Sequence, residues 1–224
     1  MSGAPVKHLA IIPDGNRRWA RERGLTVQDG HRAGIRAIDD AIRVAFDHGV
    51  EVVTFWWGSP ANLTQRAPDE VRGIVEALEG WLTSQAGTLL HDTGARFEAH
   101  GRIEELCPQL LPAIREATAQ SGAGPRRVVL LMGYDGRDEL RAAATALAEG
   151  RCASLEDGLW TGGLPDVDLL LRSGGSLHLS AGFMLWRIAE ARLAFVDELW
   201  PAVTRELMEQ QLDLASGQAR RYGR

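Results

Sequence analysis

A short polar loop near the amino terminus carries residue types that can bind a diphosphate. Asp14 stands beside Gly15, and Arg17 and Arg18 follow closely. A glycine turn exposes backbone N–H groups, and a helix start with fixed arginine charges attracts phosphate oxygens. The Asp14 carboxylate would repel a bare phosphate, so a Mg²⁺ ion that bridges carboxylate and diphosphate would reconcile the charges. The alternative is that the loop, including Asn16, is a turn that caps a helix.

A second cluster follows the apolar run 169–171 and contains Arg172, Gly174, Gly175 and Ser180. A turn with two glycines can surround a phosphate with backbone donors, and Arg172 and Ser180 can complete such a site. An ordinary loop is the alternative. A third cluster, at 133–139, contains Arg137, which could face an anion but is interpreted as an ion-pair partner of Asp138 or Glu139.

Aromatic and histidine side chains could complete a pocket. Trp56 and Trp57 are adjacent at the end of a predicted strand, so their rings should lie on opposite faces of the sheet. One ring could belong to the core, while the other could form a pocket wall for an apolar chain or stack on a cation. His31, near the start of a predicted helix, could donate to a phosphate oxygen, or it could be a cap or a surface residue.

The elements that must position these residues alternate along the chain. Strand-like patterns occur at 8–12, 50–57, 96–100, 127–132 and 167–171, and helical spacing at 29–47, 70–90, 103–120, 138–149 and 183–193. Pro108 and Pro112 should kink or break the third helix. The alternation predicts an α/β fold with a mostly parallel central β-sheet flanked by helices on both faces, as a single domain over residues 1–224. The clusters fall at strand ends, where open α/β sheets bind ligands.

Composition excludes several classes of protein. The net charge of −5 over 224 residues argues against a nucleic-acid partner. Cys107 and Cys152 are too few for a disulfide framework or a zinc site. No stretch is long and apolar enough for stable membrane insertion, and residues 1–8 lack the apolar core of a signal peptide. We therefore expect a cytoplasmic protein.

Taken in order, these segments resemble the cis-prenyltransferase family, whose best-known members are undecaprenyl diphosphate synthases. The resemblance runs from about Leu9 to the C-terminus. It rests on motifs spread along the chain: Asp14-Gly15-Asn16-x-Arg18-Trp19-Ala20, Gly30-His31-x-Ala33-Gly34, Ser59 with Asn62 and Arg66, Tyr134-x-Gly136-Arg137-Asp138-Glu139, Pro165-Asp166-x-Asp168-Leu169-Leu170-x-Arg172-x-Gly174-Gly175, Leu185-Trp186, Leu199-Trp200-Pro201 and Arg221-Tyr222-Gly223.

The resemblance implies a Mg²⁺-dependent prenyltransferase of isoprenoid biosynthesis that forms a homodimer and has a tunnel for a prenyl chain. It implies that Asp14 is a metal ligand and that the loop around it binds an allylic diphosphate. The catalytic residues it implies are Asp14, Asn16, Ser59 and Asn62, the last two orienting a group or relaying a proton. The predicted substrate-binding residues are Gly15, Arg17, Arg18, Trp19, His31, Trp57, Arg66, Arg172, His178, Ser180 and Gly223.

The sequence departs from the family pattern mainly on the side of the second substrate. Typical members continue from the paired glycines with Glu-x-Arg-x-Ser, whereas this chain has Ser176 and His178 in place of the acid and the arginine. Farther on, Arg192 aligns with a metal-binding Glu of the family. Val27 aligns with an arginine on the allylic side, and Glu-Asn-Trp is replaced by Ala61-Asn62-Leu63.

A changed acceptor site favours a changed acceptor. Some family relatives join two allylic diphosphates head-to-middle and form lavandulyl-type products. We therefore expect dimethylallyl diphosphate to be coupled with dimethylallyl or geranyl diphosphate, and the bulky tryptophan pair suits such a short product. The alternatives are head-to-tail cis elongation with isopentenyl diphosphate and a non-catalytic partner subunit of an active synthase.

Overall fold

The structure, a computed structural model, describes residues 5–217. Among them, six strands form one sheet in the order β3-β4-β2-β1-β5-β6, and every neighbouring pair is parallel. The strands are β1 (His8–Ile12), β2 (Val52–Gly58), β3 (Arg96–His100), β4 (Arg127–Met132), β5 (Leu169–Arg172) and β6 (Arg192–Phe195). Because all strands run the same way, their carboxyl ends meet at one edge of the sheet.

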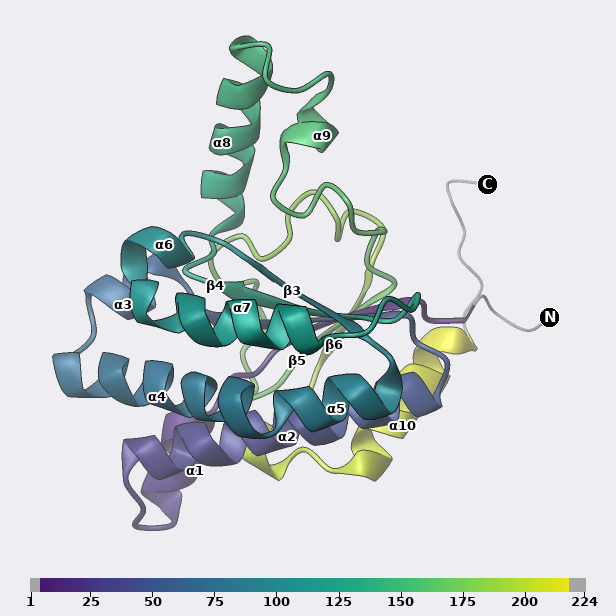
Figure 1. The fold of residues 1–224 in the computed structure, drawn as a ribbon. Helices are drawn as coiled ribbons and strands as arrows, with labels where there is room; N and C mark the ends of the chain where they lie inside the picture. The colour runs from purple at the N-terminus through teal and green to yellow at the C-terminus, as the bar shows by residue number, and fades with distance from the viewer. Residues whose placement is uncertain (1–4, 218–224) are drawn as a thin grey trace.

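Helices lie on both sides of this sheet (Figure 1). They are α1 (Asn16–Glu22), α2 (Val27–Asp47), α3 (Pro60–Thr64), α4 (Pro68–Ser84), α5 (Ala86–Thr93), α6 (Ile103–Leu106), α7 (Leu111–Gln120), α8 (Gly136–Ala148), α9 (Leu155–Gly158) and α10 (Arg205–Ser216), with 3-10 turns η1 (Pro108–Leu110) and η2 (Trp200–Ala202). Helix α8 projects away from the sheet with α9 beside it. No helix within residues 5–217 is long and apolar enough to cross a bilayer.

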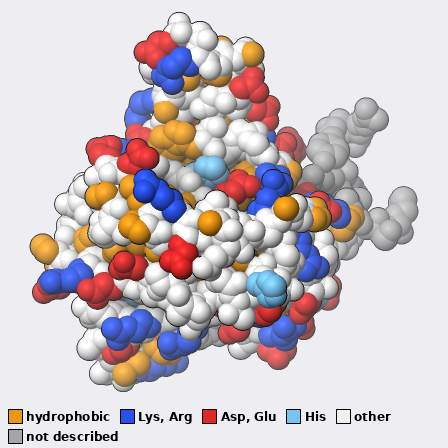
Figure 2. Space-filling view, in the orientation of Figure 1, with side chains coloured by type: hydrophobic (Ala, Val, Ile, Leu, Met, Phe, Trp, Pro, Cys, Tyr) orange, Lys and Arg blue, Asp and Glu red, His pale blue; other side chains and the backbone are white. Residues whose placement is uncertain are grey.

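The two faces of the sheet bury separate apolar clusters. Alternate side chains of the central strands, such as Leu9 and Phe55, pack with α2, α4, α5 and α7 in the larger cluster. The intervening side chains, such as Ala10, pack against Phe183 and Met184 in the smaller one. Strands buried on both faces explain why the sequence shows continuous apolar runs rather than alternation. On the face seen in Figure 2, acidic and basic side chains are interspersed.

Most predicted elements are confirmed. The strands expected at 8–12, 96–100 and 127–132 have those bounds, and the mostly parallel α/β fold is present. The helix expected at 70–90 is two helices, α4 and α5, which meet at Gln85. The proline-rich helix at 103–120 is broken into α6, η1 and α7, as expected. Helix α10 and strand β6 were not predicted.

The helix predicted at 183–193 is wrong. Residues 181–190 form turns, and Arg192 begins β6 instead. Ala181 and Met184 both have a φ of 48°, a left-handed conformation that interrupts an α-helix. Phe183, Met184 and Ile188 are nevertheless buried against the sheet. Their spacing imitates a helical stripe, although the segment is an irregular chain anchored by its apolar side chains.

Candidate active site

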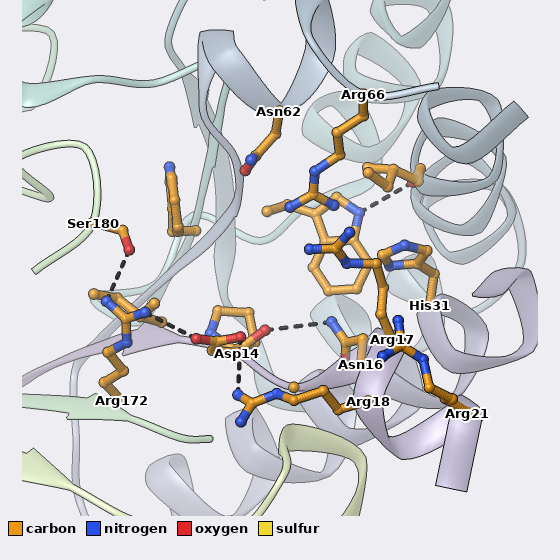
Figure 3. Close-up of a pocket in the computed structure, with 16 residues that line it drawn as sticks. Asp14, Asn16, Arg17, Arg18, Arg21, His31, Asn62, Arg66, Arg172 and Ser180 are labelled. Atoms are coloured by element: carbon orange, nitrogen blue, oxygen red, sulfur yellow. Dashed lines mark hydrogen bonds and ion pairs between the residues drawn. The ribbon is translucent and has the colours of Figure 1, made fainter. Parts of the chain in front are cut away.

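A cavity of about 470 Å³ opens at the carboxyl ends of β1, β2 and β5 (Figure 3). The loop after β1 and the ends of β2 and β5 contribute residues to its lining. Its lining combines five arginines with tryptophan rings and one carboxylate: Ile12, Pro13, Asp14, Gly15, Asn16, Arg17, Arg18, Arg21, His31, Trp56, Trp57, Asn62, Arg66, Ile74, Arg172 and Ser180. Most predicted site residues, from distant parts of the chain, therefore lie together.

The loop around Asp14 is a closely packed turn. Gly15 has a φ of 113°, and a Cβ there would lie 2.9 Å from Leu199 Cα, so the position requires glycine. The Asp14 carbonyl accepts hydrogen bonds from Ser173 Oγ at 2.8 Å and from the Trp200 backbone N–H at 2.9 Å. The loop is thus fixed by residues from the carboxyl-terminal part of the chain.

The Asp14 carboxylate is the centre of a polar network at the end of β5. Its Oδ2 accepts from Arg172 Nη2 at 2.8 Å and from Ser176 Oγ at 3.3 Å, and its Oδ1 lies 3.5 Å from Arg18 Nη2. Arg172 is buried and also donates to Ser180 Oγ at 2.8 Å and to the carbonyl of His178. The two predicted phosphate loops, far apart in sequence, therefore meet at an ion pair.

A second group of cations lies on the α1–α2–α4 side of the cavity. Arg66 and Arg17 share the Glu70 carboxylate, at 2.7 Å and 3.4 Å. Burial, with repulsion from Arg17, lowers the pKa of Arg66. Burial, with repulsion from Arg66 and Arg17, lowers the pKa of His31 to about 4. His31 Nε2 is buried without a hydrogen-bond partner. A bound anion would relieve both the repulsion and the unpaired nitrogen.

The donor set fits a magnesium ion only if the substrate supplies the other oxygens. The described residues contain no cluster of three or more His, Cys, Asp or Glu side chains that could hold a metal alone. Asp14 is the one acidic side chain among the described residues that line the cavity. Mg²⁺ commonly binds through one or two carboxylates, water and substrate phosphates, so a single Asp14 beside a diphosphate is a suitable set.

The tryptophan pair occupies both faces of the sheet, as predicted. Trp57 belongs to the larger core and donates from Nε1 to the Ile74 carbonyl at 3.1 Å. Trp56 packs with the smaller core and donates to the Tyr134 carbonyl at 3.2 Å. Both rings also line the cavity, and His31 meets Trp57 edge-on with ring centroids 6.3 Å apart. The cavity therefore has an apolar wall beside its cations.

Ser59 and Asn62 form the start of α3. Asn62 N–H donates to Ser59 Oγ at 3.0 Å, and Ser59 N–H donates to Asn62 Oδ1 at 3.2 Å. This reciprocal pair is a capping box with an amide in the acid's usual place. Asn62 lines the cavity, whereas Ser59 is buried and is absent from the lining. The predicted catalytic role of both residues stays a prediction.

Three other predicted substrate-binding residues lie differently. Trp19 is not in the cavity lining, and the Arg23 guanidinium stacks over its ring at 4.5 Å. His178 has an exposed side chain, and its backbone carbonyl is the group that meets Arg172. Gly223 lies outside the described residues.

Arg192 stands at the amino end of β6, where it pairs with Leu169, whereas Arg172 pairs with Phe195 at the cavity edge. Within one chain, Arg192 therefore does not lie beside Asp14.

The sequence analysis did not include Arg21 among the site residues. Arg21 follows Arg17 by one helical turn on α1, so the two side chains share a helix face, a spacing that could have identified it.

The cluster at 133–139 has a structural role. Asp138 pairs with Arg102 and Arg141, which corrects the expected pairing with Arg137.

Glu139, the other expected partner of Arg137, is buried. It accepts from Tyr134 Oη at 2.5 Å and from Thr161 N and Oγ1, both at 2.8 Å. Burial and the nearby Glu139 raise the pKa of Tyr134. This cluster secures the second face of the sheet and is not part of the cavity lining.

The sequence profile of the family described as "Putative undecaprenyl diphosphate synthase" matches residues 12–223. The chain belongs to this prenyltransferase family. Among curated relatives, an undecaprenyl diphosphate synthase of Pseudomonas putida is 37% identical, over 97% of this chain and 90% of its own length. An isoprenyl transferase of Heliobacterium mobile is 34% identical, over 97% and 87%.

A solved structure shares the same fold over nearly its whole length. The lavandulyl diphosphate synthase of Lavandula x intermedia, in complex with dimethylallyl diphosphate, superposes with a TM-score of 0.89 and 29% identity, over 98% of each chain. The chain thus belongs to the prenyltransferase family and has the cis-prenyltransferase fold.

Proposed function

We propose that this prenyltransferase condenses two allylic diphosphates head-to-middle into a branched, lavandulyl-type product. The donor and the acceptor are dimethylallyl diphosphates, or dimethylallyl with geranyl diphosphate. One observation carries the proposal: Ser176 Oγ lies 3.3 Å from the Asp14 carboxylate, at the position where typical family members have a glutamate. A neutral hydroxyl there leaves one carboxylate, rather than two, beside the leaving diphosphate.

The loss of an acid alters where the acceptor can bind. A second carboxylate beside Asp14 would repel the acceptor diphosphate or share its cation. With Ser176 in that place, Arg172 and Ser180 can draw an acceptor diphosphate closer to Asp14. A shift of this kind brings C2 of the acceptor double bond, the nucleophilic carbon, next to the electrophilic donor C1.

Two groups of cations suit two diphosphates. Arg17 and Arg66 lie on one side of the cavity with the neutral ring of His31, and Arg18 and Arg172 contact Asp14 on the other (Figure 3). Five arginines against one lining carboxylate leave an excess of positive charge that two polyanions can neutralise.

The residues of the site then act by holding charge and geometry. Arg17, Arg66 and His31 would hold the donor diphosphate as its C1–O bond breaks and the electron pair leaves with it. Mg²⁺, bound by Asp14 and substrate oxygens, would supply further neutralisation of the leaving diphosphate. Acceptor C2 forms the new bond to donor C1, and a methyl proton is lost from the resulting tertiary cation. We assign the orientation of that step to Asn62, which lines the cavity.

The likeness to a lavandulyl diphosphate synthase over 98% of both chains supports this regiochemistry. A second candidate is head-to-tail elongation with isopentenyl diphosphate. It is favoured by the curated relatives, which include polyprenyl and undecaprenyl diphosphate synthases. A non-catalytic partner subunit is less well supported, because Asp14, Arg18 and Arg172 form a connected, charged site. The homodimer and the cytoplasmic location stay predictions.

Substrate omission separates the candidates. The protein is incubated with Mg²⁺ and dimethylallyl diphosphate alone, then with geranyl or isopentenyl diphosphate added, and products are analysed by mass spectrometry and NMR. Branched product without isopentenyl diphosphate is the expected result. Linear product that requires isopentenyl diphosphate would support elongation and reject the proposal. No product in any mixture would favour the partner subunit.

A further inference from the structure

Asn16 and Gly34 come unusually close where α1 begins against α2. A Cβ built at Gly34 would overlap Asn16 Oδ1 and lie only 2.8 Å from Asn16 Cγ. Gly34 is buried in the middle of α2, where alanine would otherwise favour the helix by about 1 kcal/mol. The Asn16 amide fills the space that a side chain at Gly34 would occupy, and this packing compensates the helix stability lost by having glycine there.

The Asn16 amide closes the turn that presents Asp14. Its Nδ2 donates to the Pro13 carbonyl at 3.3 Å, which joins the residue before Asp14 to the first residue of α1. Gly15, the N-cap of α1, has no side chain with which to cap the helix. Asn16 Oδ1 is buried without a partner, because it faces the bare Gly34 backbone.

The space between α1 and α2 cannot widen easily. Trp200, fully buried, donates from Nε1 to the Gly34 carbonyl at 2.8 Å and from its backbone N–H to the Asp14 carbonyl at 2.9 Å. Trp200 thus fixes the distance between α2, at Gly34, and the loop that carries Asp14. An added methyl at Gly34 must displace the Asn16 side chain, since the backbones on either side are held by the same Trp200.

We infer that Gly34 is a positioning residue for the diphosphate loop. Because Gly34 has no side chain, the Asn16 amide fits beside it and donates to the Pro13 carbonyl, and this contact fixes Asp14. The inference rests on the proposed function in that the Asp14 loop binds a diphosphate. Gly30, four residues earlier, meets the backbone of Asn16 rather than its side chain. A Cβ there would overlap the Asn16 backbone carbonyl oxygen and lie 3.1 Å from its carbon, so Gly30 is needed for the helices to pack at all.

A double-mutant cycle isolates the effect. Gly34→Ala should fold, because the overlapping atoms belong to a side chain that can rotate, but it should bind Mg²⁺ with inorganic diphosphate roughly tenfold more weakly. Asn16→Ala removes the three atoms that would lie nearest to the new methyl. In that background Gly34→Ala should change the affinity less than twofold. Calorimetry gives the affinities, and thermal melting confirms folding.

Two controls complete the design. Gly80→Ala, on α4, adds a methyl with no neighbour within 4 Å, and should leave diphosphate binding unchanged. Hydrogen exchange of the peptide that contains Asp14 should be about tenfold faster in Gly34→Ala than in the wild type, whether or not a ligand binds. If the wild type bound no diphosphate, the proposed function would fail, and this exchange rate would still decide the inference.

Two results would overturn the inference. One is an equal loss of affinity from Gly34→Ala with and without the Asn16 side chain, which would place the effect in α2 itself. The other is unchanged exchange in the Asp14 peptide, which would mean that the loop does not depend on Gly34.

Discussion

The loops that follow β1 and β5 meet at the Asp14–Arg172 ion pair, yet they are built in different ways. After β1 the chain turns at once into α1, and Gly15 and Asn16 are enclosed by Leu199 and Gly34. After β5, residues 173–191 form turns with no helix or strand, and Leu177 is 79% exposed.

The difference separates a fixed half of the site, the Asp14 loop with α1 and α2, from a variable half, residues 173–191. Two departures on the acceptor side, Ser176 and His178, contact the cavity residues Asp14 and Arg172, and both lie in the irregular segment. The Asp14 loop retains the family pattern. A segment anchored by a few buried side chains, here Phe183 and Met184, can change its exposed residues with little cost to the fold. A changed acceptor with an unchanged leaving-group site is the consequence we expect.

The largest effect should follow a change in the fixed half. Asp14→Asn keeps the shape of the side chain but removes its charge, and should lower turnover by about a hundredfold or more. Thermal melting should show a folded protein, and Asp69→Asn, a change at an exposed residue of α4, should leave turnover unchanged. A fully active Asp14→Asn enzyme would remove Asp14 from the mechanism.

The stability of the fixed half should depend on pH through His31. Its pKa is about 4 in the folded chain and near 6.5 when unfolded, so the unfolded chain takes up the proton first as the pH falls. Stability is unaffected above pH 6.5 and should fall by up to about 3 kcal/mol between pH 6.5 and 4. His8, also buried with a pKa of about 4, adds a similar loss at the opposite edge of the sheet.

Urea unfolding across this pH range separates the two histidines. His31→Gln should reduce the acid loss by about half, because His8 remains. His91→Gln, at an exposed position, should retain the full loss. Inorganic diphosphate bound beside His31 should raise the pKa of its ring, and should therefore reduce the acid loss of the wild type more than that of His31→Gln. Identical acid profiles in the wild type and His31→Gln would show that His31 is not buried as a neutral ring.

A change in the variable half should alter the acceptor more than the rate. Ser176→Glu restores a carboxylate beside Asp14, and should shift the preference between dimethylallyl and isopentenyl acceptors by about tenfold toward isopentenyl diphosphate. Competition between the two acceptors, followed by product analysis, measures the shift. The same preference in both proteins would separate Ser176 from acceptor choice and leave our comparison of the two halves without its main support.

The smallest expected effect concerns the apolar wall. Trp56→Leu removes ring volume from the cavity while keeping an apolar surface, and should raise the yield with geranyl relative to dimethylallyl diphosphate about two- to threefold. The ratio of the two products under competition tests this. A lower geranyl share would show that Trp56 supports the longer chain rather than limiting it.

The sequence was most informative where local chemistry and topology agree. Apolar runs buried on both faces of a parallel sheet located β1 and β4 to the residue, and strand-end polar residues located the cavity. A parallel sheet brings its carboxyl ends together whatever the sequence separation, which is why Asp14 and Arg172 could be assigned to one site.

What the sequence could not show depends on contacts between distant residues. The apolar spacing of Phe183, Met184 and Ile188 satisfies a helix and an anchored loop equally well, and only backbone conformation decides. The resemblance gave Ser59 a catalytic role, but it did not show that the Ser59 hydroxyl accepts from the Asn62 N–H at the start of α3. The meeting of Gly34 with Asn16 requires the exact crossing of two helices, which no spacing rule predicts.

The most direct test of a two-allylic-substrate site is an isotope experiment. An equimolar mixture of [1-¹³C]- and [2-¹³C]-dimethylallyl diphosphate is supplied as the sole prenyl substrate, and the product is examined by ¹³C NMR. A head-to-middle bond joins C1 of one unit to C2 of the other, so we predict one-bond ¹³C–¹³C coupling in part of the product. A product without this coupling, or none until isopentenyl diphosphate is added, would contradict the account.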